Sequence, residues 1–238
     1  MKLDLNCDLG EGEPIGRTRA LMRHITSANV ACGGHAGDVR SMAACVRLAK
    51  QFGVKAGAHP GLWSRADFGR GDASLTPDEF ELLLLQQVSA VQAIAREAGL
   101  PLHHIKLHGA LYHASETDSK LRRRYLECVL RFWPGARIYA LAGGAVCRDA
   151  RRVGVNVWPE VFADRAYRDD GTLVARGEPG AMIPSTRGAV EQVRQVMKTG
   201  ELTTMSGARL KLVPRTVCVH SDSENAAQLL QRIASAVR

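Results

Sequence analysis

The chain has 238 residues, of which 45% are apolar and 24% are charged. This composition is typical of a globular chain long enough for one sizeable α/β core, and we expect a single domain over residues 1–238. We find no secretory leader and no run of about 18 apolar residues, so we expect a cytoplasmic protein without a membrane span. The formal charge of +8 comes without a nucleic-acid motif. We therefore expect it to attract anionic ligands and not nucleic acid.

Residues 2–12 open the chain with an amphipathic strand and a glycine-rich turn. Because side chains alternate along a strand, Asp4, Asn6 and Asp8 share one face, while the leucines between them share the other. A surface edge strand has the same pattern. Later apolar runs also end in His, Lys or Asp next to Gly, which favours a fold that gathers its strand ends at one mouth.

The next elements alternate between helix and strand. Thr76, followed by proline and two acids, marks the start of the longest helix, and the leucine run 82–85 inside that helix is interpreted as core-facing. In chain order, we predict a strand over 2–8, a helix over 18–25 with Thr18 as its N-cap, a strand over 27–32, a helix over 40–52, a strand over 54–58, an irregular loop over 62–73 and a helix over 77–98.

Two turns in this half of the chain carry imidazoles. His35 lies among small residues after the strand over 27–32, where a flexible turn is a poor place to bury a core histidine. Asp38 follows at the N-cap position of the next helix, so capping is the alternative to a ligand-binding role for it. His59 comes directly after the strand over 54–58 and before Pro-Gly.

The strand predicted over 103–108 carries the densest polar stripe. Alternation places His104, Lys106 and His108 on one face, opposite an apolar face. Three nitrogen-bearing side chains on one stripe indicate a polar site that faces a barrel lumen. His103 cannot share that face, so we expect it to be a surface or packing residue.

The remaining elements continue the alternation. In chain order, they are a helix over 117–132, a strand over 137–142, a helix that runs into the 150s, a strand over 155–161, an excursion at about 162–186 over the mouth, a helix over 187–199, two short strand-like pieces within 200–213, a strand over 216–220 and a helix over 223–237. About seven strands, each followed by a helix, predict a parallel barrel or an open doubly wound sheet. Functional side chains lie just past the strand ends in both architectures.

The cysteines do not indicate a metal knuckle or a disulfide framework, because none of them forms a Cys-x-x-Cys pair. We interpret them as small apolar fillers of the core. They are Cys7, Cys32, Cys45, Cys128, Cys147 and Cys218.

Seven motifs that span nearly the whole chain resemble the LamB/YcsF family, and they occur in the family's order. They are Asp-Leu-Asn-Cys-Asp-Leu-Gly-Glu (4–11), Ala-Cys-Gly-Gly-His-Ala-Gly-Asp (31–38), Gly-Ala-His-Pro-Gly (57–61), Phe-Gly-Arg (68–70), Lys-Leu-His-Gly-Ala-Leu-Tyr (106–112), Glu-Val-Phe-Ala-Asp-Arg-Ala-Tyr (160–167) and Cys-Val-His-Ser-Asp (218–222). The resemblance implies a seven-stranded (β/α) barrel similar to the glycoside hydrolase and deacetylase fold. It also implies ATP-dependent opening of 5-oxo-L-proline to L-glutamate, as the A component of a bacterial 5-oxoprolinase with partner subunits B and C.

This reaction sets definite chemical demands on the chain. A lactam amide is a poor electrophile, and phosphorylation of its oxygen by ATP needs positive charge, for which Lys106 and Arg165 are candidates. Attack by water then needs a general base, for which Asp8 and His108 are candidates. The predicted catalytic set is Asp8, Lys106, His108, Asp164 and Arg165. The predicted substrate-binding or nucleotide-binding set is Asn6, Glu11, Gly34, His35, Asp38, His59, Arg70, Tyr112, Glu160, His220 and Asp222.

The cofactor and the role of this chain leave alternatives open. No P-loop motif occurs, so ATP is expected either on the glycine turns at 10–12 and 33–37 or on one of the partner subunits. A divalent metal in the mouth is the sharpest alternative, and it would make the chain a metal-dependent carbohydrate deacetylase or hydrolase. A non-catalytic ligand-binding subunit is the third hypothesis. The candidate metal ligands are Asp8, His35, His59 and His220.

Overall fold

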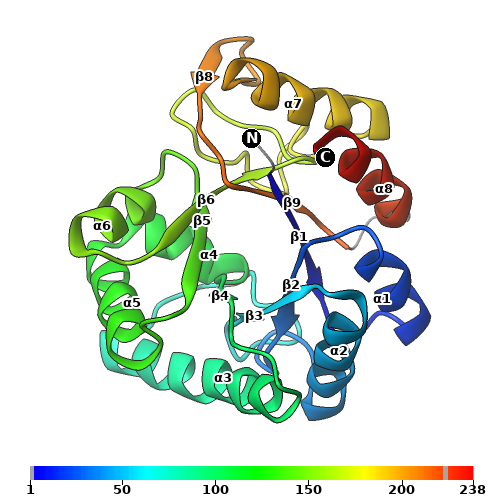
Figure 1. Ribbon diagram of the computed structural model, residues 1–238. Helices are drawn as coiled ribbons and strands as arrows, with labels where there is room; N and C mark the ends of the chain where they lie inside the picture. Colours follow the sequence, from blue (N-terminus) through cyan, green and yellow to red (C-terminus); the bar gives the residue numbers. More distant parts are fainter. Residues whose placement is uncertain (1–2, 222–224, 238) are drawn as a thin grey trace.

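Seven parallel strands close into a barrel in the computed structural model, which describes residues 3–221 and 225–237 (Figure 1). The last strand pairs with both the first and the sixth, and this double pairing excludes the open doubly wound sheet. The strands are β1 (Asp4–Leu9), β2 (Ser27–Ala31), β3 (Lys55–His59), β4 (His104–Ile105), β5 (Arg137–Leu141), β6 (Val157–Phe162) and β9 (Thr216–Val219).

Helices surround the barrel on its outside (Figure 1). They are α1 (Ile15–Met22), α2 (Val39–Phe52), α3 (Pro77–Glu97), α4 (Gly109–Thr117), α5 (Ser119–Phe132), α6 (Ala145–Val153), α7 (Thr186–Thr199) and α8 (Ala226–Val237). Within the described part of the chain, none of these helices is long and apolar enough to cross a membrane. The predicted start of the last helix, at 223–224, lies outside the described residues.

Two helix starts follow the sequence signals closely. Asp38 caps α2 in a reciprocal capping box with Ser41, and Thr76 caps α3 in a second box with Glu79. Each box satisfies two backbone N–H groups that a helix leaves without an internal partner. Local chemistry therefore sets where α2 and α3 begin.

Other predicted details differ from the structure. Helix α1 begins at Ile15, and Thr18 is no N-cap but lies buried inside the helix, where its hydroxyl donates to Glu13. Helix α4 was not predicted, and Asp118 ends it and caps α5. In the run 82–85 only the two central leucines are buried, because each helical residue turns the side chain by about 100°.

The strand β4 is shorter than the predicted 103–108. Its ladder with β5 is limited to two residues, since the chain turns into α4 soon afterwards. On the β3 side the backbone hydrogen bonds extend beyond β4 at both ends, because the N–H groups of His103, Lys106 and His108 donate to carbonyls of 56, 58 and 60. The predicted stripe of polar side chains is therefore kept.

An irregular segment of residues 163–185 separates β6 from α7. Two antiparallel bridges, Arg165 with Met182 and Tyr167 with Leu173, fold this segment back on itself. A hairpin of β7 (Glu201–Thr203) and β8 (Arg209–Lys211) then precedes β9, as the two strand-like pieces predicted. Figure 1 shows the hairpin beside α7, outside the barrel ring.

The barrel has an apolar outer layer and a polar lumen. On β1, leucines and Cys7 pack toward the helices, while Asp4, Asn6 and Asp8 point into the lumen, where they contact other strands. The lumen of a (β/α) barrel is usually filled by branched apolar side chains. This barrel buries charged and amide groups there, and each of them therefore needs a partner.

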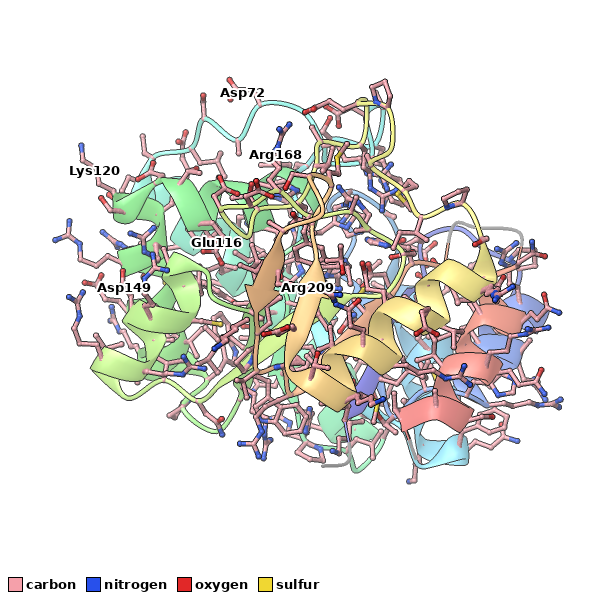
Figure 2. The ribbon with its side chains drawn as sticks, turned by 90° about the horizontal axis from the view of Figure 1, so that it is seen from above. Asp72, Glu116, Lys120, Asp149, Arg168 and Arg209 are labelled. Carbon is pink, nitrogen blue, oxygen red and sulfur yellow. The ribbon has the colours of Figure 1, made fainter. Side chains whose placement is uncertain are left out.

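Charged residues also cover the outside of the molecule. Figure 2 labels Lys120 on α5, Asp149 on α6 and Arg209 on β8, which all lie on the outer elements. Arg122 donates to Asp149 and ties α5 to α6. All six cysteines are buried free thiols, in agreement with the absence of a disulfide framework.

Gly57 gives a test of how tightly the lumen is packed. A Cβ at this position of β3 would collide with the ring of His104, which is buried and bonded to Asn29. We expect Gly57→Ala to lower the free energy of unfolding by about 1–3 kcal/mol, measured by urea denaturation. Gly135→Ala is the matched control, because a Cβ there meets nothing within 4 Å. Equal stabilities of the two variants would contradict a packed lumen.

Candidate active site at the barrel mouth

A cavity that is partly open to solvent lies over the carboxyl ends of the strands. Its floor and walls combine acids, imidazoles and cations from β1, β3, the end of β4, and the segments after β6 and β9. The predicted residues that line it are Asp8, Glu11, His59, Arg70, Lys106, His108, Tyr112, Arg165 and His220. Side chains that are more than two hundred positions apart in the sequence therefore meet in one pocket, as the strand-end argument predicts.

Lys106 is the central charge of the cavity floor. Its ammonium group lies 3.1 Å from Asp8 Oδ1, 3.2 Å from Glu160 Oε1 and 3.0 Å from Cys218 Sγ, and the residue is 2% exposed. Burial lowers its pKa, but Asp8, Cys218 and Glu160 outweigh burial and hold the pKa well above the ordinary value. The lysine therefore stays charged in the lumen.

Amide and hydroxyl groups connect this floor to the bottom of the barrel. Asn29 Nδ2 donates to Asp8 and to Asn6, each at 2.7 Å. Asn6 Nδ2 donates to Glu160 at 2.9 Å and to Thr216 at 2.7 Å, and Thr216 donates to Asp4 at 2.7 Å. This ladder satisfies buried polar groups on four strands and fixes their positions.

Asp8 has a different environment from the acids beneath it. Burial raises its pKa, but the charges of His59 and Lys106 outweigh burial and bring the pKa well below the ordinary value. Its contacts with Asn29, Lys106 and His59 all use Oδ1, and the residue lines the cavity. Asp8 is therefore a carboxylate held in place on one side and turned to the cavity.

Glu160 and Asp164 act behind the cavity wall. Glu160 is fully buried and accepts hydrogen bonds from Asn6 and from the Tyr112 hydroxyl, the latter at 3.0 Å. Asp164 accepts from His220, with its carboxylate oxygens 3.0 Å from Nδ1, and the charge of His220 helps to keep its pKa below the ordinary value despite burial. Both acids orient a side chain that does reach the cavity.

The residues after β6 supply cations to the wall opposite the histidines. Arg165 is 3% exposed, and its guanidinium donates to the carbonyls of Val174 and Ala181 within the same irregular segment. Gln192 of α7 donates to the carbonyl of Arg165 and holds the segment against the barrel. Arg176 of the same segment also lines the cavity and was not among the predicted site residues.

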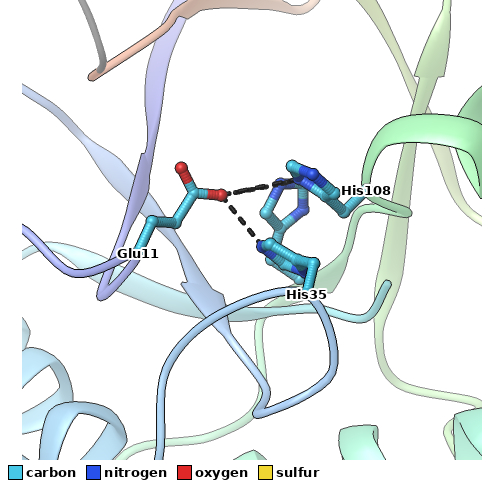
Figure 3. Close-up of side chains that lie close together, drawn as sticks. Glu11, His35 and His108 are labelled. Carbon is cyan, nitrogen blue, oxygen red and sulfur yellow. Dashed lines mark hydrogen bonds and ion pairs between the residues drawn. The ribbon is translucent and has the colours of Figure 1, made fainter. Parts of the chain in front are cut away.

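A cluster of three histidines and a glutamate lies on the β1–β4 side of the mouth (Figure 3). Glu11 Oε1 is 3.0 Å from His35 Nε2 and 3.5 Å from His108 Nδ1, and His108 Nδ1 is 3.0 Å from His59 Nε2. The rings of His35 and His108 stack with their centroids 3.5 Å apart. Figure 3 shows both residues facing the Glu11 carboxylate. We call these four residues the histidine cluster.

Burial keeps two of these rings neutral. Burial, helped by the neighbouring His59, lowers the pKa of His35 to about 3 and also lowers the pKa of His108 below its ordinary range. A neutral imidazole has one nitrogen with an available lone pair, and this nitrogen can bind a metal or accept a proton.

Several predicted site residues do not line the main cavity. Asn6 is fully buried beneath it, and Gly34 packs so closely on Gln87 and Gly61 that a Cβ there would collide with both. Asp38 is exposed and caps α2, which was the alternative offered for it; together with His35 it lines a neighbouring hollow. Asp222 lies outside the described residues.

Other residues of the site were missed at the sequence level. Cys218 contacts Lys106, and the same alternation that was used for β1 would have placed it in the lumen with Thr216 and His220. Phe162 stacks on His220 with centroids 5.5 Å apart, but nothing in its local sequence distinguishes it from a core residue. The missed residues that line the cavity are Leu107, Gly109, His113, Phe162, Leu173, Arg176 and Ser221.

Comparisons with known proteins identify the family. The model of the LamB/YcsF family matches residues 3–238. The chain belongs to the LamB/YcsF family. The resemblance of the seven motifs and the predicted barrel are both confirmed by this match and by the structure.

Named relatives within this family cover nearly the whole chain. The 5-oxoprolinase A component of Pyrococcus abyssi, named as one subunit of that enzyme, is 42% identical over 236 residues, which are 98% of this chain and 92% of that protein. The corresponding 5-oxoprolinase component of Bacillus subtilis is 40% identical over 235 residues, with 98% and 91% covered. The naming of these proteins as subunits indicates that the LamB/YcsF relatives work in a multisubunit complex.

Solved structures agree with the family assignment. A lactam utilization protein from Thermus thermophilus has a TM-score of 0.92 and 35% identity, and the match covers 100% of this chain and 96% of that one. A more distant structure from Enterococcus faecalis, with 11% identity and a TM-score of 0.52, covers 99% of this chain and 90% of its own and shares the fold alone.

Lys106→Met tests whether the buried ammonium holds the cavity floor. Its removal leaves the carboxylates of Asp8 and Glu160 buried without their cation, and breaking a buried pair costs about 3–5 kcal/mol. We expect the free energy of unfolding in urea to fall by about that amount. Lys120→Met, at an exposed position of α5, is the control and should change stability by less than about 0.5 kcal/mol. Equal stability of the two variants would refute the central role of this ammonium.

Proposed function

We propose that this chain is the A component of a 5-oxoprolinase, which opens 5-oxo-L-proline to L-glutamate with hydrolysis of ATP to ADP and phosphate, together with partner subunits B and C. The observation that carries the proposal is the identity of about 40% with named 5-oxoprolinase A components along nearly their full length. The lactam utilization protein of the same fold supports a cyclic amide as the substrate.

The mouth cavity has the groups that such a substrate needs. Arg70, Arg165 and Arg176 line the cavity and supply positive charge for that carboxylate or for a phosphoryl group. Lys106 and Asp8 lie at the floor, where the amide would be held.

We assign the chemical roles as follows. The γ-phosphoryl group passes from ATP to the lactam oxygen, so that a phosphorus–oxygen bond forms and ADP leaves. The cation pair Lys106 and Arg165 stabilises the charge on that oxygen. Water, from which Asp8 or His108 takes a proton, then attacks the activated carbon; the ring carbon–nitrogen bond breaks, the ring nitrogen leaves as an amine, and an acyl phosphate of L-glutamate remains. A second water hydrolyses this acyl phosphate to the free carboxylate and phosphate.

The glycine turns are a weaker candidate for the nucleotide site than the sequence predicts. A Cβ at Gly37 would lie 3.0 Å from the carbonyl oxygens of Ala31 and of Gly10, so glycine is needed there for packing between the turns. Arg65 already donates to the carbonyls of Gly33 and Gly37. We therefore propose that the ATP-binding site forms in the assembled complex, with residues of the partner subunits.

The histidine cluster favours a second candidate, a metal-dependent hydrolase or deacetylase of carbohydrates. This candidate predicts release of acetate from acetylated oligosaccharides by the chain alone. A non-catalytic ligand-binding subunit, the third hypothesis, predicts 5-oxoproline affinity without any turnover in the complex. Full-length identity with the named 5-oxoprolinase components supports the lactam substrate over both.

Asp8→Asn provides the direct test. We expect the variant, assembled with its partner subunits, to form L-glutamate and ADP from 5-oxoproline and ATP about 10²–10⁴-fold more slowly than the wild type, because an amide cannot accept the proton. The fold should persist, since the amide oxygen still accepts from Asn29.

Asp78→Asn is the matched control, because the side chain of Asp78 is 89% exposed. It should retain the wild-type rate. A wild-type rate in Asp8→Asn would remove Asp8 from the mechanism, and absence of 5-oxoproline-dependent ADP release in the wild-type complex would refute the proposed function.

A further inference from the structure

The histidine cluster contains two nitrogen atoms that face each other and need positive charge between them, either a second proton on one ring or a bound cation. His59 Nδ1 lies 2.7 Å from the carbonyl oxygen of Lys106, and His108 Nε2 lies 2.8 Å from the carbonyl oxygen of Phe68. A carbonyl oxygen only accepts, so each of these nitrogens carries the proton of its ring. The other two nitrogens, His59 Nε2 and His108 Nδ1, face each other at 3.0 Å, and each has a lone pair when its ring is neutral.

Further negative and lone-pair groups surround this pair. Glu11 Oε1 is 3.5 Å from His108 Nδ1 and 3.8 Å from His59 Nε2, and it is 3.0 Å from His35 Nε2. All four donor atoms lie within 4.8 Å of one another. Glu11 has a side chain only 10% exposed, and the three histidines are buried. A buried set of donors with converging lone pairs needs positive charge.

We propose that Glu11, His35, His59 and His108 bind one divalent transition-metal ion of the zinc class. Metal–nitrogen and metal–oxygen bonds of about 2.0–2.2 Å in a tetrahedron separate the donors by about 3.3 Å. Four of the six donor pairs, at 3.0, 3.0, 3.5 and 3.8 Å, are close to that value, and all six lie within 4.8 Å. Three imidazoles and one carboxylate are donors that suit zinc, cobalt and manganese ions.

The surroundings hold the rings of His59 and His108 in one orientation. The two carbonyls that accept from His59 and His108 fix the ring tautomers, as outer-shell partners do in metal sites. A Cβ at Gly61 or Gly69 would collide with His35, so the loops pack directly against that ring. The ring of Phe68 lies 5.4 Å from His35 and 5.3 Å from His108 and closes the side of the cluster.

The second group of potential ligands in the described residues is already filled. Asp8, Cys218 and His220 also lie close together, but the Lys106 ammonium is 3.1 Å from Asp8 and 3.0 Å from Cys218. A divalent ion there would meet a buried like charge. Of the ligands predicted from the sequence, His35 and His59 thus belong to the proposed site, whereas Asp8 and His220 belong to the filled group.

The test measures metal binding directly and does not depend on the lactam reaction. The full chain is stripped with a chelator and titrated with Zn²⁺ by calorimetry and with Co²⁺ by visible absorption. We expect one ion per chain, with the absorption of a four-coordinate cobalt site. Loss of an outer-shell partner costs about 10–100-fold in affinity, so removal of a ligand in His59→Gln or His108→Gln should cost at least about 100-fold.

His220→Gln is the matched control, because it removes an imidazole from the filled group and leaves all four proposed ligands. It should bind both ions as the wild type does, and circular dichroism should show that every variant is folded. X-ray absorption of the wild-type zinc form should show nitrogen and oxygen neighbours at about 2.0–2.2 Å and no sulfur.

Two results would overturn the proposal. One is failure of the folded wild type to bind Zn²⁺, Co²⁺ or Mn²⁺, which would mean that His59 and His108 share a proton instead. The other is evidence that the ion lies beside Cys218. Such evidence would be loss of metal binding in His220→Gln with retention in His108→Gln, or a sulfur neighbour in the X-ray absorption spectrum. Neither result depends on the activity of the 5-oxoprolinase complex, so the metal-site proposal and the proposed function can fail separately.

Discussion

The structure depends above all on one buried ammonium group. Lys106 reaches into the barrel and contacts Asp8 on β1, Glu160 on β6 and Cys218 on β9. An unpaired charge at 2% exposure would cost several kcal/mol, so these strands must keep their relative positions for the lysine to remain there. The same contacts set the floor of the mouth cavity. Stability of the barrel and geometry of the site therefore rest on the same group.

The two sides of the mouth differ in chemistry. On the β1–β4 side, lone pairs of histidines and a carboxylate converge, which suits a cation. On the side after β6, Arg165 and Arg176 line the wall and suit an anion. A lactam that carries a carboxylate, and that is activated by transfer of a phosphoryl group, would benefit from both. Lys106 and Asp8 line the same cavity, where the proposed reaction has its reacting carbon.

The polar lumen explains why substitutions far from the cavity should affect the site. From Asp4 at the bottom, hydrogen bonds pass through Thr216, Asn6 and Asn29 to Asp8 at the mouth. Each group in this ladder is buried and satisfied, so moving one leaves another without a partner. The hydrogen bonds make the barrel rigid beneath the site. The polar lumen should therefore tolerate side-chain substitutions less well than an apolar core does.

Periodicity, caps and strand-end positions made much of this structure predictable from the sequence. Alternation on β1 and around β4 placed Asp4, Asn6, Asp8, Lys106 and His108 on lumen-facing stripes, and Thr76 marked the start of α3, because both signals are local in the chain. Choosing the closed barrel over the open sheet was beyond local pattern, since closure depends on β9 pairing with both β1 and β6. Likewise, only the tertiary structure showed that Glu11 and His108 lie beside His35 and His59, whereas His220 pairs with Asp164. Distances between side chains on different strands follow from barrel packing, and no spacing along one strand encodes them.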